Sequence, residues 1–334
     1  MKLQQLRFLD AVVRNNLNVS SAAEELYTSQ PGVSHQIKLL EEELDIKIFE
    51  RSGKKLTGIS PAGYAILEHV EALLNNVKSI KQAAREYSNA NRGSLSLATT
   101  HTQAQFILPP ILQKFTQKYP RIDLQVHQGN PKAMCKLAAN NSVDFVIASE
   151  TIDEFDELIT IPAYRWNRYI VIPKGHSLAN KKEVTLADLA AFPILTYMLG
   201  LTGRSKLDRT FHAANLEPNV VFTATDSDVI KTYVRLGLGV GIIAEMAKGS
   251  QQDEELTCID ASHLFPDSVI KIGFRHSRHI SAYQYEFLHM MTPYLAPEVI
   301  KELVHTKALN DRNKILEAHP VPSYRDIKAK TGTT

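Results

Sequence analysis

The sequence predicts an N-terminal winged helix-turn-helix rich in α-helix, then a long linker helix, then an α/β region of two Rossmann-like lobes. Three observations carry this prediction. Three short amphipathic helices open the chain, a helix with heptad spacing follows Ser60, and short apolar strands alternate with helices from Ser94 onward. The chain has 334 residues, which at roughly 150 residues per domain allows more than one folded domain.

The composition is that of a globular protein, with 44% hydrophobic and 22% charged residues. The two cysteines, Cys135 and Cys258, exclude a disulfide framework and a zinc cage, and they fit a reducing cytoplasm. We find no signal peptide and no uninterrupted apolar segment of roughly 18 residues, so we expect a protein that is neither exported nor embedded in a membrane. The net charge of +2 excludes a chain that is basic all over but allows a local basic patch.

Apolar periodicity and capping residues predict the first three helices. Ser20 and Ser21 are the expected caps of the second helix, and a short joint separates it from the third. Ser29 is the expected cap of the third helix, where Pro31 suits the first turn. The helices are expected at residues 3–14, 19–27 and 29–44.

Two short strands, at 46–49 and 56–57, are expected around Arg51-Ser52-Gly53-Lys54-Lys55, a turn with three cations and no acid. A three-helix unit with such a basic wing lays its third helix in a DNA major groove while the cations meet phosphates. The alternative is a solvated polar face. The candidate DNA-binding residues are Ser29, Gln30, Pro31, Ser34, His35, Lys38, Arg51, Lys54 and Lys55.

A long helix begins at Ser60-Pro61, and its apolar residues step by four and three, the a/d spacing of a coiled coil. A second copy of the chain is the expected partner; the alternative is a helix packed on its own domain. The polar stretch 88–93 then marks a domain boundary. The a/d residues are Ile66, Val70, Leu73, Val77, Ile80 and Ala84.

The alternation of strands and helices beyond residue 93 predicts two small α/β lobes. From Pro297 the chain becomes polar, and we expect a loosely attached helix and a disordered tail. Strands are expected at 94–99, 122–127, 145–148, 169–172, 194–197, 220–225, 240–243 and 269–274. Helices are expected at 103–118, 131–140, 186–190, 204–214, 227–236 and 280–296.

A threonine-rich segment follows the first of these strands. Thr100, Thr102 and Gln103 bring side-chain donors to a helix start whose backbone N–H groups lack partners. This pattern predicts a site for a small anion that needs no Lys or Arg. The alternative is simple helix capping by Thr102.

Two further patterns have plain structural interpretations. Gly237-x-Gly239-x-Gly241 follows a helix and leads into a strand, the reverse of a dinucleotide-binding loop, so we interpret it as a helix stop and close-packing turn. Trp166 follows a presumed crossover at Ile161-Pro162-Ala163, where it is either a wall of the ligand cleft or a buried anchor. The histidines lack metal-ligand spacing.

The motifs together resemble the LysR-type transcriptional regulators over residues 1 to 296. The resemblance implies periplasmic-binding-protein-like lobes, a double-stranded DNA operator, a small-molecule effector, and self-association as a dimer and then a tetramer; we also expect contact with RNA polymerase. It is carried by Ala22-Ala23, Ser29-Gln30-Pro31-Gly32-Val33-Ser34, Leu39-Leu40-Glu41, Phe49-Glu50-Arg51, Leu56-Thr57-x-x-Ser60-Pro61-x-Gly63 and the segment from Val234 to Ile243.

Within that family, Thr99 to Ala104 and Gly200 to Arg204 look like the branch that regulates sulfur assimilation and cysteine biosynthesis. This implies that Thr202 and Ser149, where the family commonly has Thr, join the threonine-rich segment around the effector. The implied inducer is N-acetylserine or O-acetylserine, a sulfate-like anion fits the same donors, and sulfide or thiosulfate would oppose induction. A second sulfur regulator of this branch would answer to adenosine phosphosulfate instead.

We therefore expect a DNA-binding regulator without cofactor or metal, not an enzyme, because no nucleophile elbow, P-loop or paired carboxylates are found. A purely solute-binding protein would leave the first 60 residues unexplained. The effector-binding candidates are Thr100, Thr102, Gln103, Ser149, Thr202 and Trp166. The expected domains are the DNA-binding domain 1–60, the linker helix 61–92, lobe I at 93–163 plus 267–296, lobe II at 164–266, and the tail 297–334.

Overall fold

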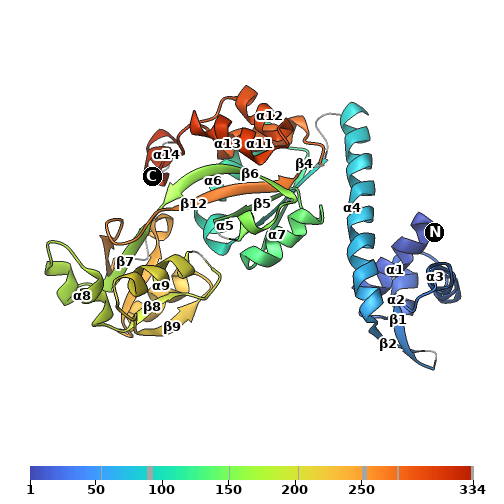
Figure 1. Cartoon of the computed structure of the whole chain (residues 1–334), viewed down its shortest axis with the longest axis horizontal. Coiled ribbons are helices and arrows are strands. Elements are labelled where there is room, and N and C mark those ends of the chain that lie inside the picture. Colours follow the sequence, from blue (N-terminus) through green and yellow to red (C-terminus); the bar gives the residue numbers. More distant parts are fainter. Residues whose placement is uncertain are drawn as a thin grey trace. The chain divides into compact units, whose positions relative to one another are not determined.

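The computed structural model describes residues 1–53, 55–88, 93–149, 151–201, 203–249, 254–276 and 278–331. It divides into two compact units, drawn in Figure 1: unit 1 is Met1–Ala84 with Asn140–Ser142, and unit 2 is the remainder. Every helix among the described residues is too short or too polar to cross a lipid bilayer.

Unit 1 opens with three helices around a small apolar core that contains Leu9, Ala22 and Ile37. The side chain of Ser29 accepts a hydrogen bond from the Gly32 N–H at 3.3 Å, which confirms the predicted cap of the third helix. The second helix is capped by Asn18 and not by the expected serines, whose N–H groups instead donate to the Asn18 side chain. The helices are α1 (Leu3–Arg14), α2 (Val19–Glu25) and α3 (Gln30–Leu44).

An antiparallel hairpin forms the wing, with β1 (Phe49–Ser52) paired to β2 (Lys55–Ile59). The first strand lies three residues closer to the turn than the sequence predicted, so Arg51 is a strand residue, and the second strand extends beyond the predicted residues at both ends. Gly53, in the turn, has a φ of +63°, in the left-handed region that favours glycine.

The long helix α4 (Pro61–Ser88) begins as predicted, because the Ser60 hydroxyl accepts the Gly63 N–H at 2.9 Å. A Cβ at Gly63 would lie 2.2 Å from the Ile48 carbonyl oxygen, so only glycine allows this approach to the wing. Val70 is buried in the core of unit 1, whereas the side chains of Leu73 and Ile80 are 37% and 69% exposed. The predicted a/d seam is therefore partly used within the chain and partly open.

Unit 2 contains two five-stranded sheets. In lobe I the order is β4-β3-β5-β12-β6, where β3 is parallel to both β4 and β5, and β12 is antiparallel to both β5 and β6. Alternate residues of β5 face opposite sides: Phe145 stacks on Phe287 of α11, whereas Val146 packs with α7. Figure 1 shows α11 and α7 on opposite sides of this sheet. The elements are β3 (Gly93–Thr99), α5 (His101–Phe106), α6 (Leu108–Lys118), β4 (Ile122–Gln128), α7 (Pro131–Ala139), β5 (Phe145–Ala148), η1 (Ile152–Glu154), β6 (Leu158–Trp166), β12 (Ser268–Arg275) and α11 (Ala282–Met291).

Lobe II has the sheet order β11-β7-β10-β8-β9. One face packs on α9 through Leu207 and Phe211, and the other face packs on α10 through Ile230 and Val234. The elements are β7 (Arg168–Pro173), η2 (Ser177–Asn180), α8 (Leu186–Ala190), β8 (Ile194–Tyr197), α9 (Arg204–Ala213), β9 (Val220–Ala224), α10 (Ser227–Arg235), β10 (Val240–Ala244), η3 (Glu245–Ala247) and β11 (Leu256–Asp260).

Two expectations about this unit were wrong. The segment Ile161-Pro162-Ala163 is not a crossover but the middle of β6, where the register with β12 shifts at the proline. The end of the chain forms three helices and not one loose helix, and Ile300 and Leu303 are buried in the main core. These helices are α12 (Pro297–His305), α13 (Leu309–Glu317) and α14 (Tyr324–Thr331).

Candidate functional site

The exposed face of α3 carries the residues predicted to read DNA. Pro31, His35 and Lys38 point into solvent at helical spacing, while Ser34 is half-buried and accepts a hydrogen bond from the Gln30 amide at 3.0 Å. Lys38 lies 3.4 Å from Glu42, an exposed pair of small energetic weight. Val33, Ile37 and Leu40 of α3 are buried in the core, so the polar surface is open to a partner.

Arg51 has a different position from the one expected of a wing cation. Its guanidinium lies 3.0 Å from the carboxylate of Glu41, which is buried and also accepts the N–H groups of Ile48 and Phe49 at 2.8 and 3.1 Å. This pair joins α3 to the wing. Lys55 is exposed, and Lys54 lies outside the described residues.

The sequence pattern gave no role to Tyr27, which lies between α2 and α3. Its side chain is 98% exposed and its φ is +50°, unusual for a bulky residue. An exposed ring in this turn adds an aromatic surface beside the start of α3. The one signal in the sequence was its place in the short joint between two helices.

The threonine-rich segment lies at the carboxyl edge of the lobe I sheet. Thr99 is paired with Ile147 of the parallel strand β5, and its hydroxyl donates to the Ile147 carbonyl at 3.1 Å. Thr100 and Ser149 follow these paired strands directly, so both reach the same edge. The structure thus brings together two candidates that are 49 positions apart.

Thr102 does not cap α5, so the structural alternative for this residue is wrong. The N-cap is Thr100, whose side chain makes no capping bond, and Thr102 is the second residue of the helix. The helix spans six residues, which makes its dipole a weak attractant for anions. Any ligand affinity here rests on side chains.

The strongest observation at this site is a buried hydroxyl without a hydrogen bond. Thr102 is 1% exposed, and its Oγ1 makes no hydrogen bond of ordinary geometry within the described residues; the same holds for the hydroxyl of Ser227, at the start of α10 in lobe II, although both hydroxyls lie close enough to the Tyr197 phenol to counteract the rise in its pKa that burial causes. Leaving such a group unsatisfied costs about 1–3 kcal/mol. Two hydroxyls, one from each lobe, therefore lack a hydrogen-bond partner, and a ligand could supply one.

Both hydroxyls lie beside Tyr197, whose phenol oxygen accepts the Ala244 N–H at 3.2 Å. Burial raises the pKa of Tyr197 to about 12, although the Ala244 N–H and the hydroxyls of Thr102 and Ser227 act in the opposite direction. The ring is therefore a neutral donor at physiological pH. Thr102, Tyr197 and Ser227 form a group that we call the hydroxyl cluster.

Gln103 is fixed by the neighbouring strand. Its amide oxygen accepts a hydrogen bond from the Tyr164 hydroxyl, and both side chains are buried. Burial raises the pKa of Tyr164 well above its usual value, so the phenol stays protonated and keeps donating. This bond leaves the amide N–H groups of Gln103 as the donors that it can offer a ligand.

Trp166 is an anchor of the loop before α9. The ring is 2% exposed and lies 5.4 Å from the guanidinium of Arg168, which donates to the Gly203 carbonyl at 2.7 Å. Gly203 has a φ of +76°, and a Cβ there would lie 2.2 Å from Arg168 Nη2. Trp166 thus fixes the turn next to Thr202, which itself lies outside the described residues.

A buried lysine was not predicted from the sequence. Lys231 is 1% exposed, and its ammonium lies 5.9 Å from the centroid of the Phe106 ring and 3.7 Å from Asp228. Asp228 also accepts a hydrogen bond from Gln105 of α5 at 2.6 Å, so the two lobes meet through polar groups. The sequence feature that could have indicated its burial is its position one turn after Ser227, on the apolar face of α10.

The glycine pattern agrees with its structural interpretation. The glycine run joins the end of α10 to β10, and a Cβ at Gly239 would lie 2.2 Å from the Pro193 carbonyl oxygen. Asp226 caps α10 by accepting the Val229 N–H at 2.9 Å. In the described part of the chain, no three His, Cys, Asp or Glu side chains converge as a metal site.

Comparison with known proteins identifies both parts of the chain. Residues 3–64 match the family "Bacterial regulatory helix-turn-helix protein, lysR family", and residues 88–296 match "LysR substrate binding domain". The HTH-type transcriptional regulator CysB of Haemophilus influenzae is 45% identical over 95% of this chain and 98% of its own length. The regulator SsuR of Burkholderia cenocepacia is 42% identical over 88% and 96%, and the regulator cbl of Escherichia coli is 38% identical over 91% and 96%.

Solved structures of other regulators are similar to this chain as well. The cofactor-binding domain of the Cbl transcriptional regulator covers 64% of this chain and 94% of its own, with 37% identity and a TM-score of 0.62. Full-length OxyR from Pseudomonas aeruginosa has the same fold over 88% of this chain and 97% of its own, with 20% identity and a TM-score of 0.67. The named relatives are regulators and not enzymes, in line with the prediction. The chain belongs to the LysR family of bacterial helix-turn-helix transcriptional regulators.

Proposed function

We propose that this regulator controls genes of sulfur assimilation and cysteine biosynthesis, and that a small anion held between its two lobes sets its activity. The observation that supports the effector part of this proposal is the buried Thr102 hydroxyl, which makes no hydrogen bond of ordinary geometry within the described residues. The similarity to CysB, SsuR and Cbl supports the choice of pathway. Contact with RNA polymerase is part of the proposal.

In this proposal Thr100, Thr102, Gln103, Ser149 and Thr202 donate to the anion. The set is neutral, and each bond to a charged ligand contributes about 1.5–3 kcal/mol. Acetylserine offers a carboxylate and polar groups beyond it, whereas sulfate and thiosulfate offer only oxygens or sulfur at one centre. Donors from two lobes are therefore best satisfied by the longer ligand, N-acetylserine or O-acetylserine, which we propose as inducer.

The proposed DNA interface is the exposed face of α3 with the wing, presented twice in a dimer so that operator half-sites are related by two-fold symmetry. The open part of the α4 seam supports the dimer, and further association through the lobes would give a tetramer. The proposed domains are 1–60, 61–92, lobe I at 93–163 plus 267–296, lobe II at 164–266, and 297–334. In this scheme effector binding between the lobes changes the spacing of the two winged helices.

Calorimetry on the full chain tests the effector assignment. N-acetylserine, O-acetylserine, sulfate, thiosulfate and adenosine phosphosulfate are titrated into the wild type and into Thr100→Val, which keeps the side-chain shape and removes the hydroxyl. Thr116→Val is the matched control, because Thr116 is exposed on α6. Binding of an acetylserine that only Thr100→Val weakens supports the proposal. Binding of adenosine phosphosulfate alone would favour a Cbl-like role, and binding of none would overturn the sulfur-sensing assignment.

A further inference from the structure

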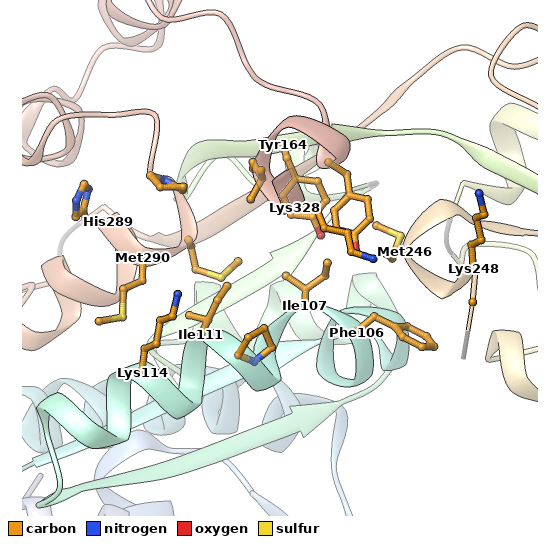
Figure 2. A pocket seen from close by; sticks show the side chains of 16 residues that line it. Phe106, Ile107, Ile111, Lys114, Tyr164, Met246, Lys248, His289, Met290 and Lys328 are labelled. Carbon is orange, nitrogen blue, oxygen red and sulfur yellow. The ribbon is translucent and has the colours of Figure 1, made fainter. Parts of the chain in front are cut away.

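Unit 2 contains a cavity of about 480 Å³ that the proposed function does not use. Its floor is apolar and comes from the junction of α5 and α6, through Phe106, Ile107 and Ile111, with Met246 and Met290 beside them. Figure 2 shows Ile107 and Ile111 on this floor, with Tyr164 and Lys328 across from them. Methionine side chains adapt to ligands of different shape, so this lining suits an apolar group.

The charged groups around the cavity have one sign. Three of the described lining residues are lysines, Lys114, Lys248 and Lys328, and none is acidic. The ammonium of Lys248 lies 4.4 Å from the centroid of the Tyr169 ring, which fixes its place at the rim. An apolar floor with cations at its edge is complementary to a molecule with an apolar body and one anionic head.

One wall of the cavity belongs to α14, beyond the residues that match the family. Tyr324 packs on the Tyr164 ring at 5.9 Å between centroids. Arg325 ties the helix to lobe II through Glu245 at 3.2 Å and Asp260 at 2.5 Å. Arg325 pairs with both carboxylates, and the described residues that line the cavity include lysines but no acid.

We propose that this cavity is a second ligand site, for a small amphipathic carboxylate or sulfonate, and that it is coupled to the effector site. The contact that joins the two sites is the hydrogen bond from Tyr164, which lines the cavity, to Gln103. The short helix α5 also has Thr100 at one end and Phe106 at the other. The coupling rests on the proposed function; the binding of an amphipathic anion does not.

The binding half is tested with the full chain and two probes, 2-naphthalenesulfonate and 2-naphthoate, which separate a sulfonate from a carboxylate preference. The neutral 2-naphthalenemethanol measures the contribution of the charge. We expect at least tenfold weaker binding of the preferred anion to Lys114→Gln with Lys248→Gln. The control is Lys132→Gln with Lys136→Gln, two exposed lysines of α7 outside the cavity. Equal affinity of both double variants, or equal affinity of anion and alcohol, would overturn the proposal.

Ile111→Glu is a second variant, which places an acid on the apolar floor. It should abolish probe binding while a circular dichroism spectrum shows that the protein is folded. If Ile111→Glu unfolds the chain, the lysine variants still decide, because their side chains are exposed or lie at the rim. Retained probe affinity in a folded Ile111→Glu protein would place the binding elsewhere and contradict the proposal.

The coupling is measured as the ratio of N-acetylserine affinities with and without saturating probe. We expect a change of at least threefold in the wild type and a ratio near one in Tyr164→Phe, which keeps the ring and removes the donor; thermodynamic reciprocity requires the same factor for the probe. Thr100→Val separates the two ideas, because it should remove N-acetylserine binding and spare probe binding. If the wild type binds N-acetylserine but not the probe, the cavity proposal is overturned. If the wild type does not bind N-acetylserine, the proposed effector and the coupling are overturned, and the cavity proposal stands.

Discussion

Polar side chains are used in opposite ways on α3 and in the hydroxyl cluster. On α3 they lie in solvent, where water satisfies them until a partner arrives, as for His35 and Lys38. In the cluster, Thr102 and Ser227 are buried without a hydrogen bond in the described part of the chain. The first surface is therefore stable without its partner, whereas the second is stabilised by one. A substitution on the exposed face of α3 should change binding alone, and one in the cluster should change both stability and binding.

The largest expected effect concerns the open seam of α4, an apolar surface exposed in the single chain. Leu73→Asp with Val77→Asp should weaken self-association by several kcal/mol, because two charges would be buried in the interface without partners. Sedimentation should show smaller species, and operator affinity should fall. The single chain should still fold, since Leu73 is 37% exposed and Val77 is half-buried.

Ala65→Asp is the control for the seam, because Ala65 is exposed and outside the a/d positions. It should leave both the sedimentation and the operator affinity unchanged. If the double variant also keeps its size and affinity, assembly runs through the α/β lobes and the seam has no role in it. Residual association of the double variant is compatible with a second interface in the lobes.

The next largest effect is expected for Glu41, whose buried carboxylate should stabilise unit 1. Glu41→Ala removes the acceptor of the Ile48 and Phe49 N–H groups and leaves Arg51 without its partner, at a cost of about 3 kcal/mol. Glu42→Ala, on the exposed side of the same helix, should cost less than about 0.5 kcal/mol. Urea denaturation followed by circular dichroism compares the two. Equal losses would mean that the carboxylate of Glu41 does not hold the wing to α3.

How well the sequence predicts a feature depends on how far apart in the sequence the residues that form it lie. Helices α1 to α3 and the cap at Ser29 were predicted because their determinants lie within one or two turns. The strands β3 and β5 were found from their apolar runs, and their parallel pairing then placed Thr100 beside Ser149. Local chemistry was therefore enough for the fold class and for placing the lobe I residues of the candidate effector site at one edge of the sheet.

Features that depend on distant pairing were missed. The segment Ile161-Pro162-Ala163, predicted as a crossover, is part of β6, and its pairing with β12 accommodates the proline through a shift in register. Tyr197 and Lys231 showed no sign of a site, since a tyrosine that ends a strand and a lysine in a helix are ordinary until lobe packing buries them. Arg51 is predicted to bind DNA, and nothing local in the sequence indicates that it also pairs with the buried Glu41.

Thr102→Val should raise the stability of the ligand-free protein and lower its affinity for the effector, as the comparison of α3 with the hydroxyl cluster predicts. The substitution removes a buried hydroxyl that makes no hydrogen bond within the described residues, so the ligand-free protein should gain up to about 1 kcal/mol of unfolding free energy. The same variant should bind the effector at least tenfold more weakly. Thermal unfolding with and without N-acetylserine gives both values. A loss of stability in the ligand-free variant would mean that the hydroxyl already has a partner in the protein.

The smallest effect should come from the wing. Lys54→Ala with Lys55→Ala should weaken binding to every DNA sequence alike and lower the slope of log affinity against log salt by about one for each phosphate that is no longer neutralised. Stability should stay within about 0.5 kcal/mol, because Lys55 is exposed and neither lysine is expected to support the core. Fluorescence anisotropy across a salt series, on an operator and on an unrelated duplex, measures the slope.

Arg51→Ala sharpens this last comparison, because it removes a cation of the same wing that is already paired with Glu41. It should destabilise unit 1, yet at temperatures where the variant is folded its salt slope should stay closer to the wild type than that of the double lysine variant. A slope that falls equally in both would mean that Arg51 exchanges Glu41 for phosphate when DNA binds, which would support its predicted role in DNA binding. An unchanged slope in the double lysine variant would mean that Lys54 and Lys55 do not contact the DNA backbone.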